Sequence, residues 1–155
     1  MLAKARKIAW DIRRDQTEAV ASIYGSETLA LNLNHTTNSS SITVNKSTVA
    51  APLILADGGA GMAAIAQIGQ GRGLAYGADV LGWMSGTTRE QQHYPFFLRA
   101  FRWLVTGNGG KALPSTLNFA VAGYSASNVT SYLSRAGSTA TVVTCAVADP
   151  ANTCW

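Results

Sequence analysis

The stretch from Pro52 to Thr106 reads PLILADGGAGMAAIAQIGQGRGLAYGADVLGWMSGTTREQQHYPFFLRAFRWLVT and holds the densest run of apolar residues in the chain. Two turns divide its first half, Asp57-Gly58-Gly59 and Gly69-Gln70-Gly71, because aspartate and glycine supply the positive backbone angles that tight hairpins need. Short strands are predicted between and beside these turns, over Leu53–Ala56, Met62–Ile68 and Arg72–Gly77. This region should therefore fold as a β-meander.

An amphipathic helix closes the same stretch. Pro95 suits a first helical turn, and Thr106-Gly107 provides a stop signal. Arg99 and Arg102 fall on one face of this helix, and the opposite face is apolar. The apolar residues are Phe97, Ala100, Phe101, Leu104 and Val105. We expect the helix to cover the meander.

The residues after this helix predict one βαβ unit. Leu117–Ala122 and Thr139–Ala146 are apolar or β-branched, as buried strands are, and an amphipathic segment ending at Ala136 separates them. Ser125 or Ser127 can cap the helix between the strands.

The residues before the central stretch predict a helix and a second hairpin. Ala3–Ser22 has a helical pattern with a basic face, and Leu29–Leu33 and Ile42–Val49 alternate as half-buried strands do. The fold class is therefore α/β, a mixed β-sheet flanked by helices, with a hairpin and meander region and one βαβ unit near the C-terminus. We expect residues 1–155 to form a single domain or a fragment of one, and the polar stretch 107–113 is the candidate for an internal boundary.

Composition and charge restrict the function. Charged residues make up 13% of the chain, about half of the usual ~25%, and a surface of small polar residues is typical of exported bacterial proteins. We therefore expect the protein to be secreted, periplasmic or on the cell surface. The net charge is +4, but five of the twelve basic residues lie in the first fourteen positions, and no basic stripe with interleaved aromatic residues indicates nucleic-acid binding. No run of about 18 apolar residues predicts a membrane span.

The two cysteines, Cys145 and Cys154, flank a turn at Asp149-Pro150. In an exported protein these cysteines favour a local disulfide, and in a cytosolic protein they would be two unpaired thiols. No metal site is predicted, because His35 and His93 lack the paired spacing that a zinc site needs.

Four residues are weak candidates for catalysis. Ser125 lies in Gly123-Tyr124-Ser125-Ala126-Ser127, where a hydrolase elbow would need a glycine at position 127 and a histidine after the serine. Asp79, Glu90 and His93 are the other acid or base candidates, and the alternative is that Glu90 and His93 are surface residues of a polar loop. Helix capping explains the serines, so no catalytic residue is predicted.

No cofactor is predicted either. Gly69, Gly71, Gly73 and Gly77 flank a strand, whereas phosphate-binding glycine loops precede a helix and often carry G-K-[ST]. These four residues are better explained as turn glycines.

Aromatic residues near the meander predict a binding surface. Trp83 and Tyr94, together with Asp79, are the candidates for a sugar-binding platform. Trp103 is a further candidate, for which a core position is an equally good explanation.

Three segments carry a family resemblance: GQGRGLAYGADVLGWM (69–84), PFFLRAFRWLVTGNGG (95–110) and LNFAVAGYSASNVTSYLSRAG (117–137). They resemble the closing part of glutamine-amidotransferase-like α/β domains. With the DGG turn and the ending TCAVADPANTCW, residues 50–155 are similar to the N-terminal, non-peptidase region of secreted bacterial enhancin-type metallopeptidases, which act on mucin-like glycoproteins. The zinc-binding HExxH helix of that family and the G-x-C-x-G elbow of the amidotransferases are both missing from this sequence. The resemblance therefore implies an accessory domain with no catalytic residues to transfer.

Three functional hypotheses follow. The first is a non-catalytic accessory or binding module that recognises or positions a glycoprotein, glycan or cell-surface partner, within a larger polypeptide that includes a zinc metallopeptidase. The second is a small hydrolase that uses Ser125 or the group of Asp79, Glu90 and His93. The third is a structural or assembly fragment that completes its sheet with a missing segment.

Overall fold

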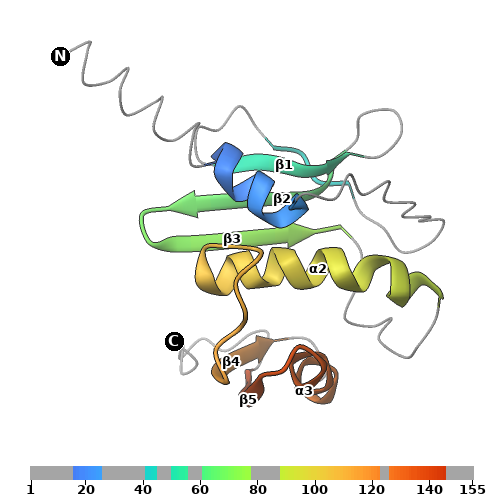
Figure 1. Ribbon diagram of the computed structural model, residues 1–155, viewed down its shortest axis with the longest axis vertical. Coiled ribbons are helices and arrows are strands. Elements are labelled where there is room, and N and C mark those ends of the chain that lie inside the picture. Colours follow the sequence, from blue (N-terminus) through green and yellow to red (C-terminus); the bar gives the residue numbers. More distant parts are fainter. Residues whose placement is uncertain are drawn as a thin grey trace, which may run out of the picture.

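The computed structural model describes residues 16–25, 41–44, 50–55, 61–77, 88–122 and 126–145. Within these ranges the chain forms three helices and five strands, in two sheets. Helix α2 lies between the three-stranded sheet and a smaller unit of two strands and one helix (Figure 1). The α/β class, the meander and the C-terminal βαβ unit are all confirmed.

The meander consists of β1 (Ala50–Leu55), β2 (Gly61–Ile68) and β3 (Gly71–Tyr76), paired antiparallel in that order. The predicted second and third strands are confirmed to within one residue at each end, and the first strand begins three residues before Leu53. Gly69 has a φ of 58° between β2 and β3, which is the backbone conformation that its position in a tight turn predicted. The predicted turn at 57–59 lies outside the described residues.

Helix α2 runs from Thr88 to Thr106, so the prediction that Pro95 occupies the first turn is wrong. A proline inside a helix removes one hydrogen bond, to the carbonyl four residues earlier. The residues just before it, Arg89, Glu90, Gln91 and Gln92, are good helix formers and continue the helix in the N-terminal direction. The stop at Thr106-Gly107 is confirmed, and Gly107 has a φ of 80°.

Helix α2 is buried on two faces. Phe96, Ala100 and Trp103 are 0%, 0% and 1% exposed and belong to a first cluster with Ile65 of β2 and Ile23. The second cluster packs Phe97 and Phe101 of α2 against residues of the C-terminal unit. Three half-buried residues contact both clusters: Leu74, Tyr76 and Leu104. The two clusters are therefore continuous through α2.

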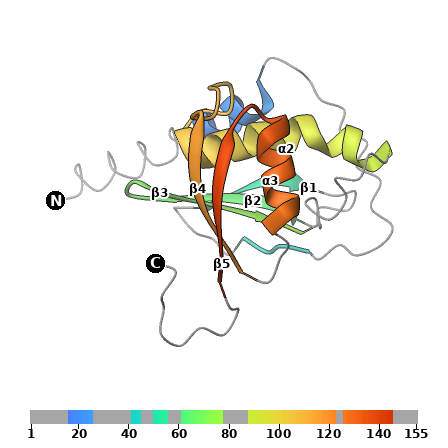
Figure 2. The same cartoon turned by 90° about the horizontal axis from the view of Figure 1, so that it is seen from below.

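The C-terminal unit contains β4 (Thr116–Ala122), α3 (Ala126–Arg135) and β5 (Thr139–Cys145). The two strands pair in parallel from Thr116↔Thr139 to Ala122↔Cys145, as a βαβ unit requires. The amphipathic character predicted for the helix between the strands is confirmed, because Val129, Tyr132 and Leu133 are buried on one face of α3. The parallel and the antiparallel strands occupy separate sheets, and α3 lies beside β5 (Figure 2).

The described N-terminal residues add one helix. Residues 16–24 are helical and extend two residues beyond the predicted end at Ser22, and residues 3–15 lie outside the described part. Of the predicted second hairpin, Leu29–Leu33 also lies outside it. Residues 42–44 form no strand, so that part of the prediction is wrong, and Ile42 donates a single backbone hydrogen bond to the Gly61 carbonyl at 2.8 Å. From Ala63 onward β2 pairs with β1 on one side and β3 on the other, so only its first residues remain free to bond residues 42–44.

The polar stretch 107–113 packs on helix 16–24. The backbone amide of Gly109 donates to the Ser22 hydroxyl at 3.1 Å, and the same hydroxyl donates to the Ala19 carbonyl at 2.8 Å. Gly109 and Leu113 are buried. The contact of Gly109 with helix 16–24 ties the stretch to the first cluster, whereas Leu113 belongs to the second cluster. The internal boundary near 107–113 remains a prediction.

Candidate functional site

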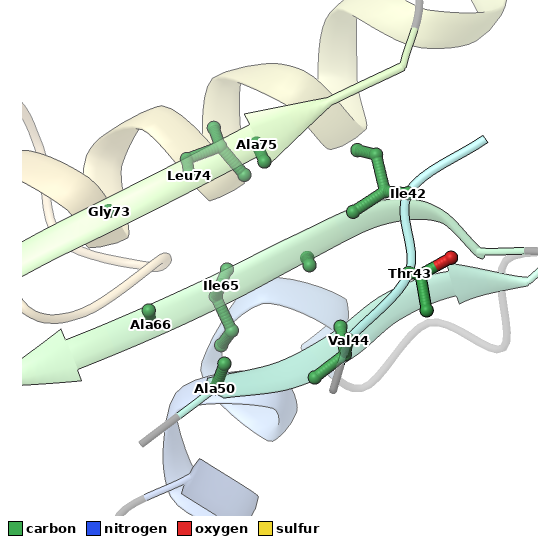
Figure 3. A pocket seen from close by; sticks show the side chains of 10 residues that line it. Ile42, Thr43, Val44, Ala50, Ile65, Ala66, Gly73, Leu74 and Ala75 are labelled. Carbon is green, nitrogen blue, oxygen red and sulfur yellow. The ribbon is translucent and has the colours of Figure 1, made fainter. Parts of the chain in front are cut away.

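An apolar hollow of about 390 Å³ lies on the face of the meander opposite α2. Residues 42–44 cross this face of the sheet and form one wall of the hollow, and strands β2 and β3 form its floor (Figure 3). The lining residues are Ile42, Thr43, Val44, Ala50, Ala64, Ile65, Ala66, Gly73, Leu74 and Ala75.

The floor of the hollow follows from the alternation of side chains along a strand. Ala64 pairs with Ala75, and Ala66 pairs with Gly73, so four small residues share one face of the sheet. Larger residues alternate with them and pack toward the helices, Ile65 among them. The face opposite the helices is therefore shallow, because its side chains are too short to fill the space under residues 42–44.

The chemistry of the hollow is limited by its lining. None of the lining residues is ionisable, and the Thr43 hydroxyl is the one polar side-chain group among them. The hollow can accommodate an apolar group. It has no acid, base or nucleophile for catalysis and too few hydrogen-bonding side chains to bind a sugar.

The catalytic candidates lie at or beyond the edges of the described structure. Asp79 and Ser125 are outside the described residues. Glu90 and His93 lie within α2, so their interpretation as loop residues is wrong, and a spacing of three places both on one side of the helix. The structure describes the backbone of this part of α2 but not these two side chains, and the catalytic role remains a prediction.

The aromatic residues predicted to bind a sugar also lie partly outside the described residues. Trp83 is outside the described residues, and Tyr94 lies on the α2 backbone one position before Pro95. Trp103 is 1% exposed in the first cluster, so it is a core residue and not part of a platform. The sugar-binding platform of Trp83, Tyr94 and Asp79 remains a prediction.

The two serines near α3 occupy different positions relative to the start of the helix. Helix α3 begins at Ala126, which leaves Ser125 as the residue directly before the helix. Ser127 lies inside the helix and therefore cannot be its N-cap.

Titratable groups are few in the described part of the chain. Glu18, on helix 16–24, is the one carboxylate whose side chain falls within the described residues, and the basic side chains there are Arg72, Arg99, Arg102, Lys111 and Arg135. Burial raises the pKa of Tyr24 above its ordinary value of 10.0, and it raises the pKa of Tyr76 further, with a contribution from the nearby Tyr24. Both phenols are thus held neutral at physiological pH.

Basic side chains lie at the ends of two helices. The Arg72 Nη1 atom donates to the Leu104 carbonyl at 3.4 Å, close to the end of α2. The Arg99 guanidinium lies against Gly25, directly after helix 16–24. A cation at a helix C-terminus stabilises the helix dipole, so we assign these two arginines a structural role.

One of the two cysteines, Cys145, lies within the described residues. Cys145 ends β5 and is not a free thiol, but Cys154 lies outside the described residues, so the Cys145–Cys154 disulfide remains a prediction. No group of three or more His, Cys, Asp or Glu residues is close enough to bind a metal among the residues that the structure covers. In that same part of the chain, no helix is long and apolar enough to cross a membrane.

The hollow was not predicted from the sequence. Its floor is made of alanine and glycine, which carry no reactive group, and Gly73 was interpreted as a turn residue although it lies inside β3. The alternation of small residues at 64, 66, 73 and 75 was the available signal.

Comparisons with known proteins assign the chain to a family. The family described as the immunomodulating metalloprotease N-terminal domain matches residues 19–155. The immunomodulating metalloprotease of Pseudomonas aeruginosa is 36% identical over 86 residues, which is 56% of this chain and 9% of that protein.

Solved structures of the same relative have the same fold. The IMPa metallopeptidase from Pseudomonas aeruginosa has a TM-score of 0.69 at 26% identity, covering 96% of this chain and 16% of the other. The structure of IMPa in complex with an O-glycopeptide has a TM-score of 0.67 at 27% identity, covering 89% and 16%. The structure in complex with T-antigen has a TM-score of 0.58 at 25% identity. The chain thus spans a small part of these relatives, and it belongs to the family of immunomodulating metalloprotease N-terminal domains.

Proposed function

We propose that this chain is a non-catalytic accessory module of a secreted bacterial metalloprotease and that it helps to recognise or position a glycoprotein substrate. The observation that carries the proposal is the match of residues 19–155 to an N-terminal domain of a metalloprotease, in a sequence without an HExxH zinc motif. The low content of charged residues and the predicted disulfide support a location outside the cytoplasm.

The relatives suggest the chemical class of the partner. IMPa has been solved in complex with an O-glycopeptide and in complex with T-antigen. We therefore propose that the partner of this chain also carries carbohydrate. A sugar needs an aromatic surface for its apolar face and polar groups for its hydroxyls.

The connection between β3 and α2 is the proposed contact region. It joins Tyr76 to Thr88 and contains Asp79 and Trp83, and Tyr94 follows on α2. The two aromatic side chains would stack on the sugar, and the Asp79 carboxylate would accept hydrogen bonds from its hydroxyls. The apolar hollow is a poorer candidate, because its lining has one polar side-chain group.

Calorimetric titration of the 155-residue chain with an O-glycopeptide tests the proposal. We expect Trp83→Ala and Tyr94→Ala each to weaken binding about tenfold or more, since loss of one aromatic contact costs roughly 1 kcal/mol or more. Ile68→Ala is the control, because it removes an exposed apolar side chain at the end of β2, which is not part of the proposed region. Absence of binding at millimolar peptide, or equal affinities for all variants, would refute the proposal.

The hydrolase alternative has its own test. Turnover of ester or peptide substrates by the chain, lost in Ser125→Ala, would establish an enzyme in place of a binding module. Unchanged behaviour of Ser125→Ala is the result expected for the module.

The structural or assembly alternative is supported by one observation. Strands β4 and β5 form a parallel sheet of two strands, whereas parallel sheets usually have more strands and are covered on both faces.

A further inference from the structure

The outer edge of β5 is open within the described structure. β5 pairs with β4 alone, and the one further backbone hydrogen bond of the strand joins the Thr139 amide to the Ser115 carbonyl, at the β4 side. In a paired strand every second residue directs its amide and carbonyl away from the partner. Several backbone groups of β5 therefore face outward with no partner among the described residues.

This edge lacks the features that usually prevent strand association. The sequence of β5, TATVVTC, contains no charged residue and no proline, and its register with β4 is regular throughout. The edge strands of the meander differ, because β1 contains Pro52 and two register irregularities and β3 contains Arg72. Val143 is also 54% exposed, on the face of the sheet away from the core.

The sequence of β5 is complementary to itself. In an antiparallel pair centred on Val142, Thr141 lies opposite Val143 of the second copy, and Ala140 lies opposite Thr144. β-Branched cross-strand pairs of this kind stabilise a sheet, and no like charges oppose each other in the pair. The two-fold axis would be perpendicular to the sheet, which keeps the core-facing residues of both copies on one face.

We propose that β5 pairs antiparallel with β5 of a second copy of this chain. The pairing extends two strands to four, which is a common sheet size, and it satisfies the outward backbone groups of both copies. It is an isologous interface, as most homodimers have. The interface uses residues of β5 and none of the residues assigned to the proposed sugar-binding region.

Sedimentation equilibrium of the 155-residue chain over a range of concentrations tests the pairing. We expect a monomer–dimer equilibrium that Val143→Lys weakens about tenfold or more, because two ammonium groups would then lie at diagonal positions across the pair. Ala120→Lys is the matched control. Ala120 is the register partner of Val143 and is exposed on the same face, but it lies on β4. It should leave the dimer unchanged.

Several outcomes would overturn the pairing. A monomer at all concentrations would do so, and so would a dimer that Ala120→Lys disrupts and Val143→Lys does not. Hydrogen exchange of the unmodified chain gives an independent readout in case Val143→Lys does not fold. Amides of β5 should exchange more slowly as the concentration rises while those of β2 do not change, and a dimer without this protection of β5 would refute the proposal.

Discussion

Replacing Phe101 with alanine tests whether α2 joins the two clusters into one cooperative unit. Phe101 is 7% exposed and packs with three rings, at centroid distances of 6.4 Å to Phe97, 5.5 Å to Phe119 and 5.8 Å to Tyr132. Truncating such a residue costs about 3–5 kcal/mol, from lost burial and from the cavity that remains. Since a domain is stable by about 5–15 kcal/mol in total, the variant should lose a large fraction of its stability.

Hydrogen exchange shows which elements lose stability in the Phe101→Ala variant. A change of 3 kcal/mol corresponds to a more than 100-fold change in an opening equilibrium. If the chain unfolds as one unit, the most protected amides of β2, in the first cluster, and of α3, in the second, should both exchange faster by this factor. Urea unfolding of the same variant should stay a single transition, with its midpoint lowered.

Two further variants control the experiment. Phe96→Ala, on the opposite face of α2, should produce the same joint acceleration, because Phe96 is 0% exposed in the first cluster. Ile68→Ala removes an exposed apolar side chain and should change stability by less than about 0.5 kcal/mol. Faster exchange in α3 alone after Phe101→Ala, with β2 unaffected, would refute the single unit and would support a boundary near residues 107–113.

Three other predictions concern single sites. Gly109→Ala should destabilise the chain by about 1–3 kcal/mol in urea titration, because its Cβ would lie 2.5 Å from the Ser22 carbonyl oxygen and 2.9 Å from the Ile23 Cα. Gly110→Ala is the control and should be nearly neutral, because no atom would lie closer than 3.4 Å to its Cβ. Equal losses of stability in the two variants would contradict the steric explanation. The folded chain holds the Tyr76 proton more tightly than the unfolded chain, whose phenol has a pKa of 10.0, so the free energy of unfolding should decrease as the pH rises above that value. Urea midpoints measured between about pH 8 and pH 11 should show this decrease, and a decrease of the same size in Tyr76→Phe would exclude Tyr76 as its cause. Cys145→Ser should cost roughly 2–3 kcal/mol if the predicted disulfide with Cys154 closes its short loop, and a reducing agent should lower the unfolding midpoint of the unmodified chain but not of the variant.

The sequence predicted those elements whose cause is local. The turn at Gly69 follows from backbone chemistry, and β2 and β3 follow from the apolar run that it divides. The βαβ unit also has a local pattern, in which two strand segments flank an amphipathic helix with Val129, Tyr132 and Leu133 inward. These elements lie within a residue or two of their predicted limits.

The second face of α2 was not predicted, for a physical reason. A single apolar stripe on a helix indicates one buried face, and Phe97, Phe101 and Leu104 supply such a stripe. Phe96 and Trp103 extend the apolar surface around the helix, so α2 is buried against both the three-stranded sheet and the C-terminal unit. Which unit packs on the second face is determined by tertiary packing and not by the pattern of the helix itself. The observed start of α2 differs from the predicted one because proline commonly marks a first helical turn, whereas here the residues before Pro95 favour a helix as well.

The candidate site was less predictable than the fold. Asp79, Trp83 and Ser125 were chosen for their chemistry, and their placement depends on segments that have no periodic pattern. The residues of the hollow, by contrast, carry no reactive group, and the hollow exists because residues 42–44 lie across this face of the sheet. Sequence motifs do not indicate a cavity that is formed by the absence of large side chains.

The unequal packing of the two glycine-rich turns decides where a reporter or affinity tag can be inserted. A Cβ at Gly69 would meet no atom within 4 Å, so the β2–β3 turn is open to solvent and a short inserted peptide there would leave both clusters intact. The turn at Gly109 is in backbone contact with helix 16–24, and an insertion of the same length would separate that helix from α2. For labelling or immobilising the module, Gln70 is therefore the suitable position.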